Sequence, residues 1–198
     1  TATLNHHKSM YPKRVFVWDA IRRGIPVLPP DVCHSELEWT PTSRGVRAGL
    51  HIIKGLRASL CRQIIDERAK EAFHDIRDFR RRITFNTGEL ERLITVGACR
   101  SFGRRESLLQ DVQQTDRFSR QLPLLTLPWQ ELPSLLEAEL RFTDIPFSAH
   151  PVEYAPEATC TATSMKQYIG RHVTMIGILD SCKFTQIQEK KGPSRHTS

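Results

Sequence analysis

The stretch from Val46 to Arg68 constrains the fold most strongly, because apolar side chains recur at helical spacing on both sides of a glycine turn. They are Val46, Leu50 and Ile53 before the turn, and Leu60, Ile64 and Ile65 after it. Gly55 lies where the first helix must end, and glycine readily adopts the positive φ that reverses a chain there. The sequence therefore predicts two short amphipathic helices joined by a tight turn.

A helix that begins directly after such a turn presents unpaired backbone N–H groups, which favour anions such as phosphate. Basic side chains also surround the expected second helix. This combination is typical of a helix-hairpin-helix element, which holds a nucleic-acid backbone without reading its sequence. The candidate contacts of this first hairpin are Lys54, Gly55, Leu56, Arg57, Ser59 and Arg62.

Two alternatives stay open for this stretch. Paired amphipathic helices with a glycine turn are also common as plain core packing. Arg57 stands where the commonest form of the element has a second glycine, so its side chain either obstructs a phosphate or supplies a cation. Because exposed arginines contribute little to folding, we expect Arg57→Ala to leave stability nearly unchanged.

The charge distribution supports a nucleic-acid partner. The whole chain has a net charge of +7, and between Arg44 and Arg105 there are 15 Lys and Arg against 7 Asp and Glu, a balance of +8. The remaining residues sum to −1. A basic excess confined to the segment with the hairpin is expected of a surface that binds DNA or RNA. Runs such as Arg80–Arg82 are usually solvated helix faces, so no single arginine in them is assigned a contact.

A second helix, turn and helix follow within the same basic segment. Apolar spacing over residues 73–83 predicts a short connecting helix. Asn86 and Glu89 predict a capping box at the start of the next helix, and Gly97 predicts its end. The turn over residues 98–103 then leads into a further helix. The candidate contacts of this second hairpin are Arg100, Ser101, Gly103, Arg104 and Arg105.

The flanking segments predict smaller elements. Residues 16–24 fit an amphipathic helix that ends at Gly24, residues 27–30 an extended apolar segment, and residues 38–47 a short β-hairpin that shares Val46 with the helix predicted above. After the hairpins, the Leu- and Pro-rich residues 122–133 predict an extended connector, and residues 135–140 a short helix. Alternating apolar residues between 168 and 182 predict strands.

Five blocks also resemble one known family in the family's own order. They are YPKRVFVWDAIRRGIPVLPPDVCHSE, GLHIIKGLRASLCRQIIDERAKEAFHDIRDFRRR, ELERLITVGACRSFG, FTDIPFSAHPVEY and YIGRHVTMIGILDSCKFTQ. These blocks are similar to the end of the fingers, the hairpin domain, a linker and the first OB-fold strands of bacterial DNA polymerase III alpha subunits. These subunits are the C-family replicative or error-prone polymerases.

The resemblance implies a mainly α chain with a tandem helix-hairpin-helix domain, a small N-terminal α/β piece and a truncated C-terminal OB-like β segment. It implies the end of the fingers at residues 1–43, the DNA-binding hairpins at 44–115, a proline-rich linker with a short helix at 116–165 and the start of an OB-fold at 166–198. The implied partners are double-stranded DNA and, beyond it, the remaining polymerase domains and replisome subunits.

The resemblance also implies that catalysis lies elsewhere. The family are DNA-directed nucleotidyltransferases whose acidic palm residues hold two Mg²⁺ ions upstream of the blocks matched here, and this chain has no D-x-D pair. We therefore expect a fragment that contains no catalytic residue, needs no cofactor of its own and is inactive alone, with Mg²⁺ belonging to the full-length enzyme. The blocks do not distinguish the replicative from the error-prone paralogue.

Composition narrows the remaining classes. Five scattered cysteines without a C-x-x-C pair argue for reduced thiols and against a zinc site. No apolar run approaches eighteen residues and no signal peptide is evident, so we expect a cytoplasmic protein without a membrane partner. A stand-alone hairpin protein of nucleic-acid repair and a protein-interaction fragment remain the alternatives to a polymerase segment.

Overall fold

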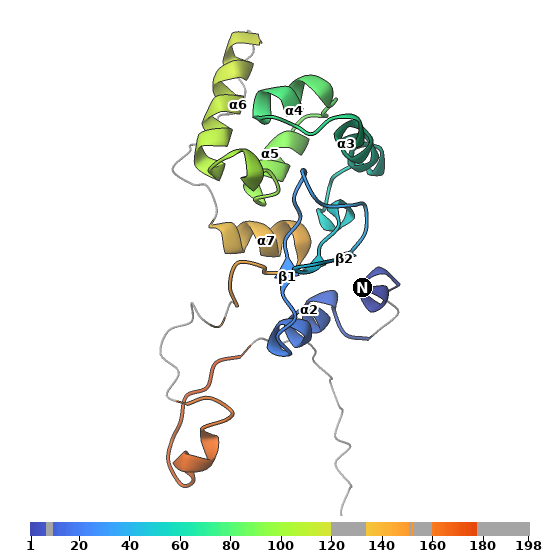
Figure 1. Ribbon diagram of the computed structural model, residues 1–198. Helices are drawn as coiled ribbons and strands as arrows, with labels where there is room; N and C mark the ends of the chain where they lie inside the picture. The colour runs from blue at the N-terminus through green and yellow to red at the C-terminus, as the bar shows by residue number, and fades with distance from the viewer. Residues whose placement is uncertain (7–9, 120–133, 151, 153–159, 178–198) are drawn as a thin grey trace, which may run out of the picture.

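The computed structural model describes residues 1–6, 10–119, 134–150, 152 and 160–177, the side chains of 113–119 excepted. Helices dominate these residues and surround one small sheet (Figure 1). The helices are α1 (Ala2–Asn5), α2 (Lys13–Arg22), α3 (Ala58–Lys70), α4 (Ile76–Arg82), α5 (Glu89–Thr95), α6 (Arg105–Ser119) and α7 (Leu135–Thr143). Short 3₁₀ turns occur at η1 (Leu50–Ile52), η2 (Arg100–Phe102) and η5 (Met165–Tyr168). The predicted mainly α class is confirmed.

The N-terminal piece combines a helix with the sheet. Strand β1 (Val27–Leu28) pairs in parallel with β3 (Gly45–Arg47), which pairs antiparallel with β2 (Thr40–Thr42), in the order β1-β3-β2. The predicted β-hairpin and the predicted extended segment at 27–30 are both present. The predicted helix is α2, and Gly24 follows its end with φ of +79°.

The first helix predicted before the Gly55 turn is wrong. Val46 belongs to β3, and the only helical turn between it and Gly55 is the 3₁₀ turn η1. Residues 48–53 are all buried except His51, which stays exposed. A segment buried on nearly every side is enclosed by the core, whereas an amphipathic helix would leave one broad face in water.

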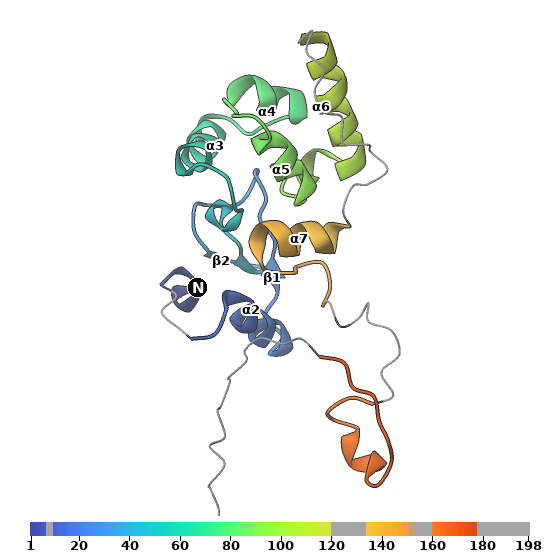
Figure 2. The same ribbon diagram turned by 180° about the vertical axis from the view of Figure 1, so that it is seen from behind.

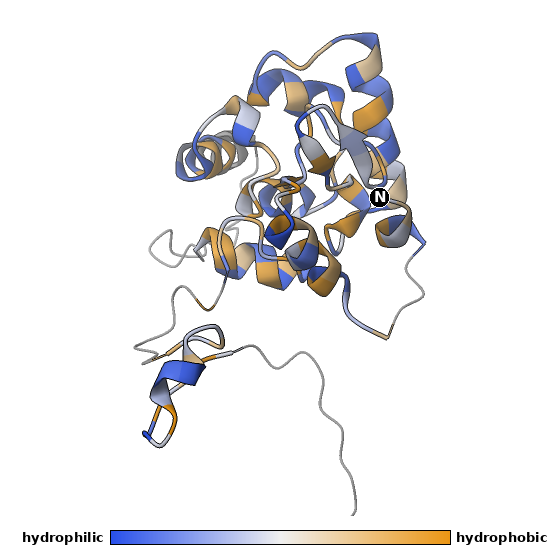
Figure 3. Ribbon diagram, turned by 60° about the horizontal axis from the view of Figure 1, so that its bottom comes forward, coloured by the Kyte–Doolittle hydropathy of each residue, from blue (hydrophilic) through white to orange (hydrophobic). Residues whose placement is uncertain are grey.

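Helices α3 to α6 form one end of the molecule, as Figures 1 and 2 both show. Phe79 of α4 is fully buried at the centre of this end, with ring centroids 4.9 Å from Phe73, 5.3 Å from Phe85 and 5.6 Å from Phe102. Phe102 lies in η2, so this aromatic cluster joins the connecting helix to the second hairpin. Figure 3 shows hydrophilic and hydrophobic positions interleaved along the helices, as expected when each has one buried face.

Helix α7 packs against the hairpins rather than standing apart from them. The Phe142 carbonyl accepts a 2.8 Å hydrogen bond from the Lys54 N–H, and Ile145 is 2% exposed within the same core. Buried Glu139 accepts 2.8 Å bonds from the Phe147 and Ser148 N–H groups and from the Ser148 hydroxyl. This part of the stretch predicted as a linker thus belongs to the folded core. The connector predicted at 122–133 lies outside the described residues.

The C-terminal strands are not found where the structure can test them. Residues 168–177 contain the end of η5, a turn at Gly170 and non-strand backbone up to Gly177. The predicted strands are therefore wrong over this range. The rest of the predicted OB-like segment, residues 178–198, lies outside the described residues.

Candidate nucleic-acid interface

The first hairpin consists of η1, a turn over residues 53–57 and α3. Gly55 has φ of +78°, the left-handed conformation predicted for it. Arg57 is the N-cap of α3, and no side chain caps the helix. The N–H groups of the first turn of α3 are therefore open at Ala58 and Ser59, both of which are exposed.

Arg57 spans the two hairpins. Its Nε and Nη2 each lie 2.9 Å from an oxygen of Glu89, the first residue of α5, and Nη2 also donates to the Thr84 carbonyl at 3.1 Å. The Glu89 side chain is only 4% exposed and accepts a further 2.7 Å bond from the Asn86 N–H. A bidentate pair on a buried carboxylate fixes both groups. Arg57 therefore braces the second hairpin against the first, and its guanidinium is engaged.

Two other groups of the first turn are also engaged. The Gly55 carbonyl accepts a 2.7 Å bond from Arg92 of α5. The Lys54 ammonium lies 2.6 Å from Asp144 at the end of α7, in a pair whose two side chains are more than half exposed. Leu56 is half-buried against the core. Of the six predicted contacts of this hairpin, Ser59 and Arg62 are exposed without a side-chain partner among the described residues.

The Arg57–Glu89 pair has a consequence for acid stability. The hydrogen bond from Arg57, reinforced by the N–H groups of Asn86 and Arg57, lowers the pKa of Glu89 below its ordinary value of 4.5, against the opposing effect of burial. A carboxyl whose pKa is lower in the folded state stabilises the fold above its unfolded pKa and loses that contribution as pH falls through the folded pKa.

We therefore expect the stability difference between the natural protein and Glu89→Gln to be largest at neutral pH and to shrink as pH falls below about 4.5. Urea unfolding at a series of pH values measures this difference. The other carboxylates are the same in both proteins, so their titration cancels. A difference that stays constant down to about pH 3 would contradict the assigned role of Glu89.

The second hairpin consists of α5, a turn over residues 96–104 that contains η2, and α6. Gly97 has φ of +78°, and the N–H groups of Gly97 and Ala98 bond back to Ile94 and Leu93 at 2.9 and 2.8 Å. This is a Schellman end for α5, as Gly97 predicted. The predicted capping box is present in part: Glu89 receives the Asn86 N–H, but the N-cap is Gly88, with φ of +78°.

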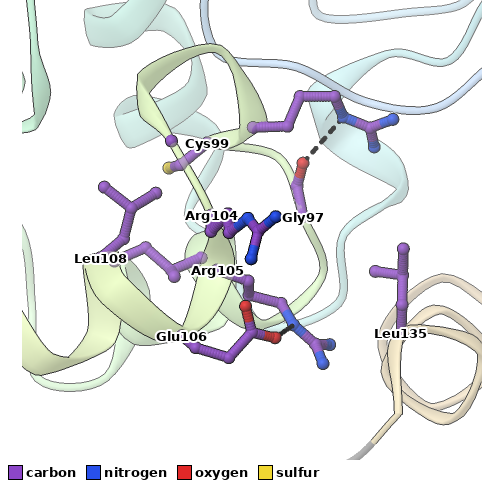
Figure 4. Close-up of a pocket in the computed structure, with 10 residues that line it drawn as sticks. Gly97, Cys99, Arg104, Arg105, Glu106, Leu108 and Leu135 are labelled. Carbon is purple, nitrogen blue, oxygen red and sulfur yellow. Dashed lines mark hydrogen bonds and ion pairs between the residues drawn. The ribbon is translucent and has the colours of Figure 1, made fainter.

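An open hollow of about 400 Å³ lies at this turn, where α6 begins (Figure 4). Its lining includes Gly97, Arg100, Gly103, Arg104, Arg105 and Glu106. Three arginines and one glutamate thus line the hollow, and the Arg105 Nε lies 3.6 Å from a carboxylate oxygen of Glu106. Four of the five residues predicted for the second hairpin lie together at this hollow.

The three arginines of the hollow differ in their freedom. The Arg100 Nε donates to the Gly97 carbonyl at 3.0 Å, and Arg105 donates to the Thr95 carbonyl at 3.0 Å. The Arg104 side chain is exposed and forms no hydrogen bond or ion pair with the described residues. The fifth predicted residue, Ser101, donates to buried Asp31 at 2.9 Å and so ties the turn to the N-terminal piece.

Arginines that the sequence assigned to a general basic surface are partly structural. Arg82 donates to the carbonyls of Glu67 and Glu71, which end α3, and stacks on Phe73 at 4.6 Å. Arg68 donates to the carbonyls of Val32 and Ser35 at 3.1 and 2.8 Å. Both side chains are 14% exposed. Their partners are distant in sequence, so no local signal could reveal these roles.

The arginines left free in the basic segment are few. Within the described residues, four exposed arginine side chains have no hydrogen-bond or ion-pair partner: Arg44, Arg62, Arg77 and Arg104. Among them, Arg104 lines the hollow at the start of α6. The second hairpin thus has an arginine side chain without a partner at its turn.

The described residues contain no group of three or more His, Cys, Asp or Glu side chains that could hold a metal ion. Cys33, Cys61, Cys99 and Cys160 are free thiols, and burial raises the pKa of Cys33 to about 11. Among the described helices, none combines the length and apolar character needed to cross a membrane.

Comparison with known proteins agrees with this geometry. Residues 24–108 match the family model of the helix-hairpin-helix motif. The chain therefore contains the helix-hairpin-helix motif over this range, which includes the first hairpin, α5, the turn that follows it and residues 105–108 of α6.

Curated proteins of similar sequence indicate a more specific family than the motif does. The error-prone DNA polymerase of Corynebacterium glutamicum is 30% identical over 151 residues, which are 75% of this chain and 14% of that protein. The DNA polymerase III alpha subunit of Deinococcus radiodurans is 35% identical over 102 residues, 50% of this chain and 8% of the relative. That of Staphylococcus aureus is 37% identical over 101 residues, 48% of this chain and 10% of the relative. The chain is homologous to one segment of the bacterial DNA polymerase III alpha subunits and error-prone polymerases, and it spans no more than 14% of the length of these three relatives.

Proposed function

We propose that the chain binds the phosphate backbone of double-stranded DNA, without sequence preference, as the duplex-holding segment of a DNA polymerase III alpha-like polymerase in replication or translesion synthesis. The observation that carries this proposal is the hollow at the start of α6 (Figure 4), whose lining includes Arg100, Arg104 and Arg105. Helix N-termini and guanidinium groups both favour a phosphate.

The polymerase context rests on the length of the similarity. The alignment with the Corynebacterium glutamicum polymerase covers 151 residues, whereas the hairpin match covers residues 24–108. A stand-alone repair protein that shared only the hairpins would not extend the similarity in this way. We further propose that the chain acts beside DNA in the cytoplasm, that the other polymerase domains are its protein partners and that Mg²⁺-dependent chemistry belongs to those domains.

A salt titration of binding to a random-sequence duplex tests the proposal. If the chain contacts about four phosphates, log K falls with log salt at a slope of about −3.6. Arg104→Gln removes one free cation from the hollow, so we expect weaker binding and a slope flatter by about one. Fluorescence anisotropy of a labelled duplex measures both quantities.

The matched control is Arg23→Gln, which removes an exposed arginine paired with Asp19 beyond the end of α2. This variant should bind as the natural protein does. Salt-independent binding would indicate the protein-interaction alternative, and a strong preference for one duplex sequence would contradict backbone recognition.

A further inference from the structure

A second basic hollow lies on the N-terminal side of the first hairpin. It has a volume of about 470 Å³ and is bordered by the start of α2, by η1 with the residues that follow it, and by the end of α7. Its charged and titratable lining consists of Lys13, Arg14, His51, Lys54 and Asp144. In Figures 1 and 2, α2 and α7 lie on opposite sides of the small sheet, so the hollow joins parts of the chain that are distant in sequence.

The side chains of this hollow are suited to an anion. The Lys13 side chain forms no hydrogen bond or ion pair with the described residues, and the Lys54 ammonium pairs with Asp144, both side chains being more than half exposed. An exposed pair of this kind contributes little stability, so a stronger anion can compete with Asp144 for the ammonium group. The lining therefore offers at least two lysines to an incoming negative group against one carboxylate.

His51 adds a defined hydrogen-bonding group. Its Nδ1 lies 2.6 Å from the Leu37 carbonyl oxygen. Because a carbonyl only accepts, Nδ1 carries the proton of this bond, and the Nε2 of the neutral ring is an acceptor. The imidazolium form donates from Nε2, and it is this form that can bond to a phosphate oxygen.

The position of the hollow connects it to the hairpin. Lys54 directly precedes Gly55, so one residue belongs both to the first turn and to the lining. At that turn the cation expected to meet a phosphate, Arg57, is held by Glu89. Lys13, His51 and Lys54 place further basic groups beside this turn, in the lining of the hollow.

We infer that this hollow binds a phosphodiester group of duplex DNA, as a contact additional to the second hairpin, through Lys13, His51 and Lys54. This inference rests on the proposed function and deepens it. The first hairpin then contributes to DNA binding through the N-terminal piece, and the duplex extends from the start of α6 to the start of α2.

A pair of variants on one helix tests the inference in the full chain. Lys13→Gln removes a lysine at the start of α2 that lines the hollow, and Arg22→Gln removes an exposed arginine at the other end of α2, outside the lining. Binding to a labelled random duplex is measured for both over a range of salt concentrations. Lys13→Gln should flatten the slope of log K against log salt by about one, and Arg22→Gln should leave it unchanged.

The outcomes separate this inference from the proposed function. If the natural protein binds and Arg104→Gln weakens it, but the slopes of Lys13→Gln and Arg22→Gln are equal, the inference is overturned and the proposed function stands. If the natural protein does not bind duplex DNA, both are overturned. Thermal unfolding of each variant shows whether a lost contact reflects a lost fold, and Lys13→Arg, which keeps the charge, should restore the natural slope.

Discussion

Arg57→Ala is expected to lower the stability of the protein markedly. The substitution leaves the buried Glu89 carboxylate without its bidentate partner, and a buried carboxylate deprived of its counter-ion costs on the order of 2–3 kcal/mol. For a chain of this length such a loss lowers the unfolding midpoint by roughly 5–10 °C. This expectation replaces the one from the sequence, in which Arg57 was an exposed cation of little importance to folding.

Thermal unfolding followed by circular dichroism measures the effect, with Arg62→Ala as the matched control. Arg62 lies five residues further along the same hairpin and has no side-chain partner among the described residues. Its removal should change the midpoint by less than about 2 °C. Equal midpoints for the two variants would show that the Arg57–Glu89 pair does not brace the hairpins.

Gly49→Ala is the second substitution with a large expected effect. Gly49 has an ordinary φ of −77°, but a Cβ there would lie 2.4 Å from the Leu37 carbonyl oxygen and 2.5 Å from the Glu38 carbonyl carbon. Both are backbone atoms, so no side chain can move aside. The loop before the first hairpin must shift, at a cost of about 3 kcal/mol.

Gly24→Ala is the control that distinguishes the steric clash at Gly49 from the cost of an unfavourable φ. Gly24 has φ of +79°, but no atom lies within 4 Å of the position that a Cβ would take there. The substitution therefore costs only the left-handed conformation, about 1 kcal/mol. Chemical denaturation of both variants measures the two costs. A Gly24→Ala protein less stable than Gly49→Ala would contradict the packing described for residues 37–50.

Features that depend on local spacing were predictable from the sequence. Gly97 marks the end of α5 because a left-handed residue there closes the Schellman pattern. The apolar stripes of α3 and α4 were equally clear, because each contains enough turns for the helical period to appear. Four of the five residues proposed for the second hairpin meet at one hollow for the same reason: they are close together in sequence.

Features that depend on distant partners were not predictable. The spacing of Val46, Leu50 and Ile53 fits a helix. In the structure, however, Val46 lies in β3 and pairs with Val27 of β1. Arg57 and Glu89 are separated by 32 positions, and no residue close to Arg57 in sequence indicates that its side chain pairs with a buried carboxylate. The basic excess likewise gave no sign that Arg68 and Arg82 bind backbone carbonyls.

The central claim is that the second hairpin binds a DNA phosphate, whereas Arg57 of the first hairpin stabilises the fold through its ion pair with Glu89. The salt dependence of duplex binding by Arg104→Gln and Arg57→Gln, measured side by side at a temperature where both are folded, tests it most directly. The account predicts a slope flatter by about one for Arg104→Gln and the natural slope for Arg57→Gln, which is the less stable protein. A flattened slope for Arg57→Gln together with an unchanged slope for Arg104→Gln would contradict it.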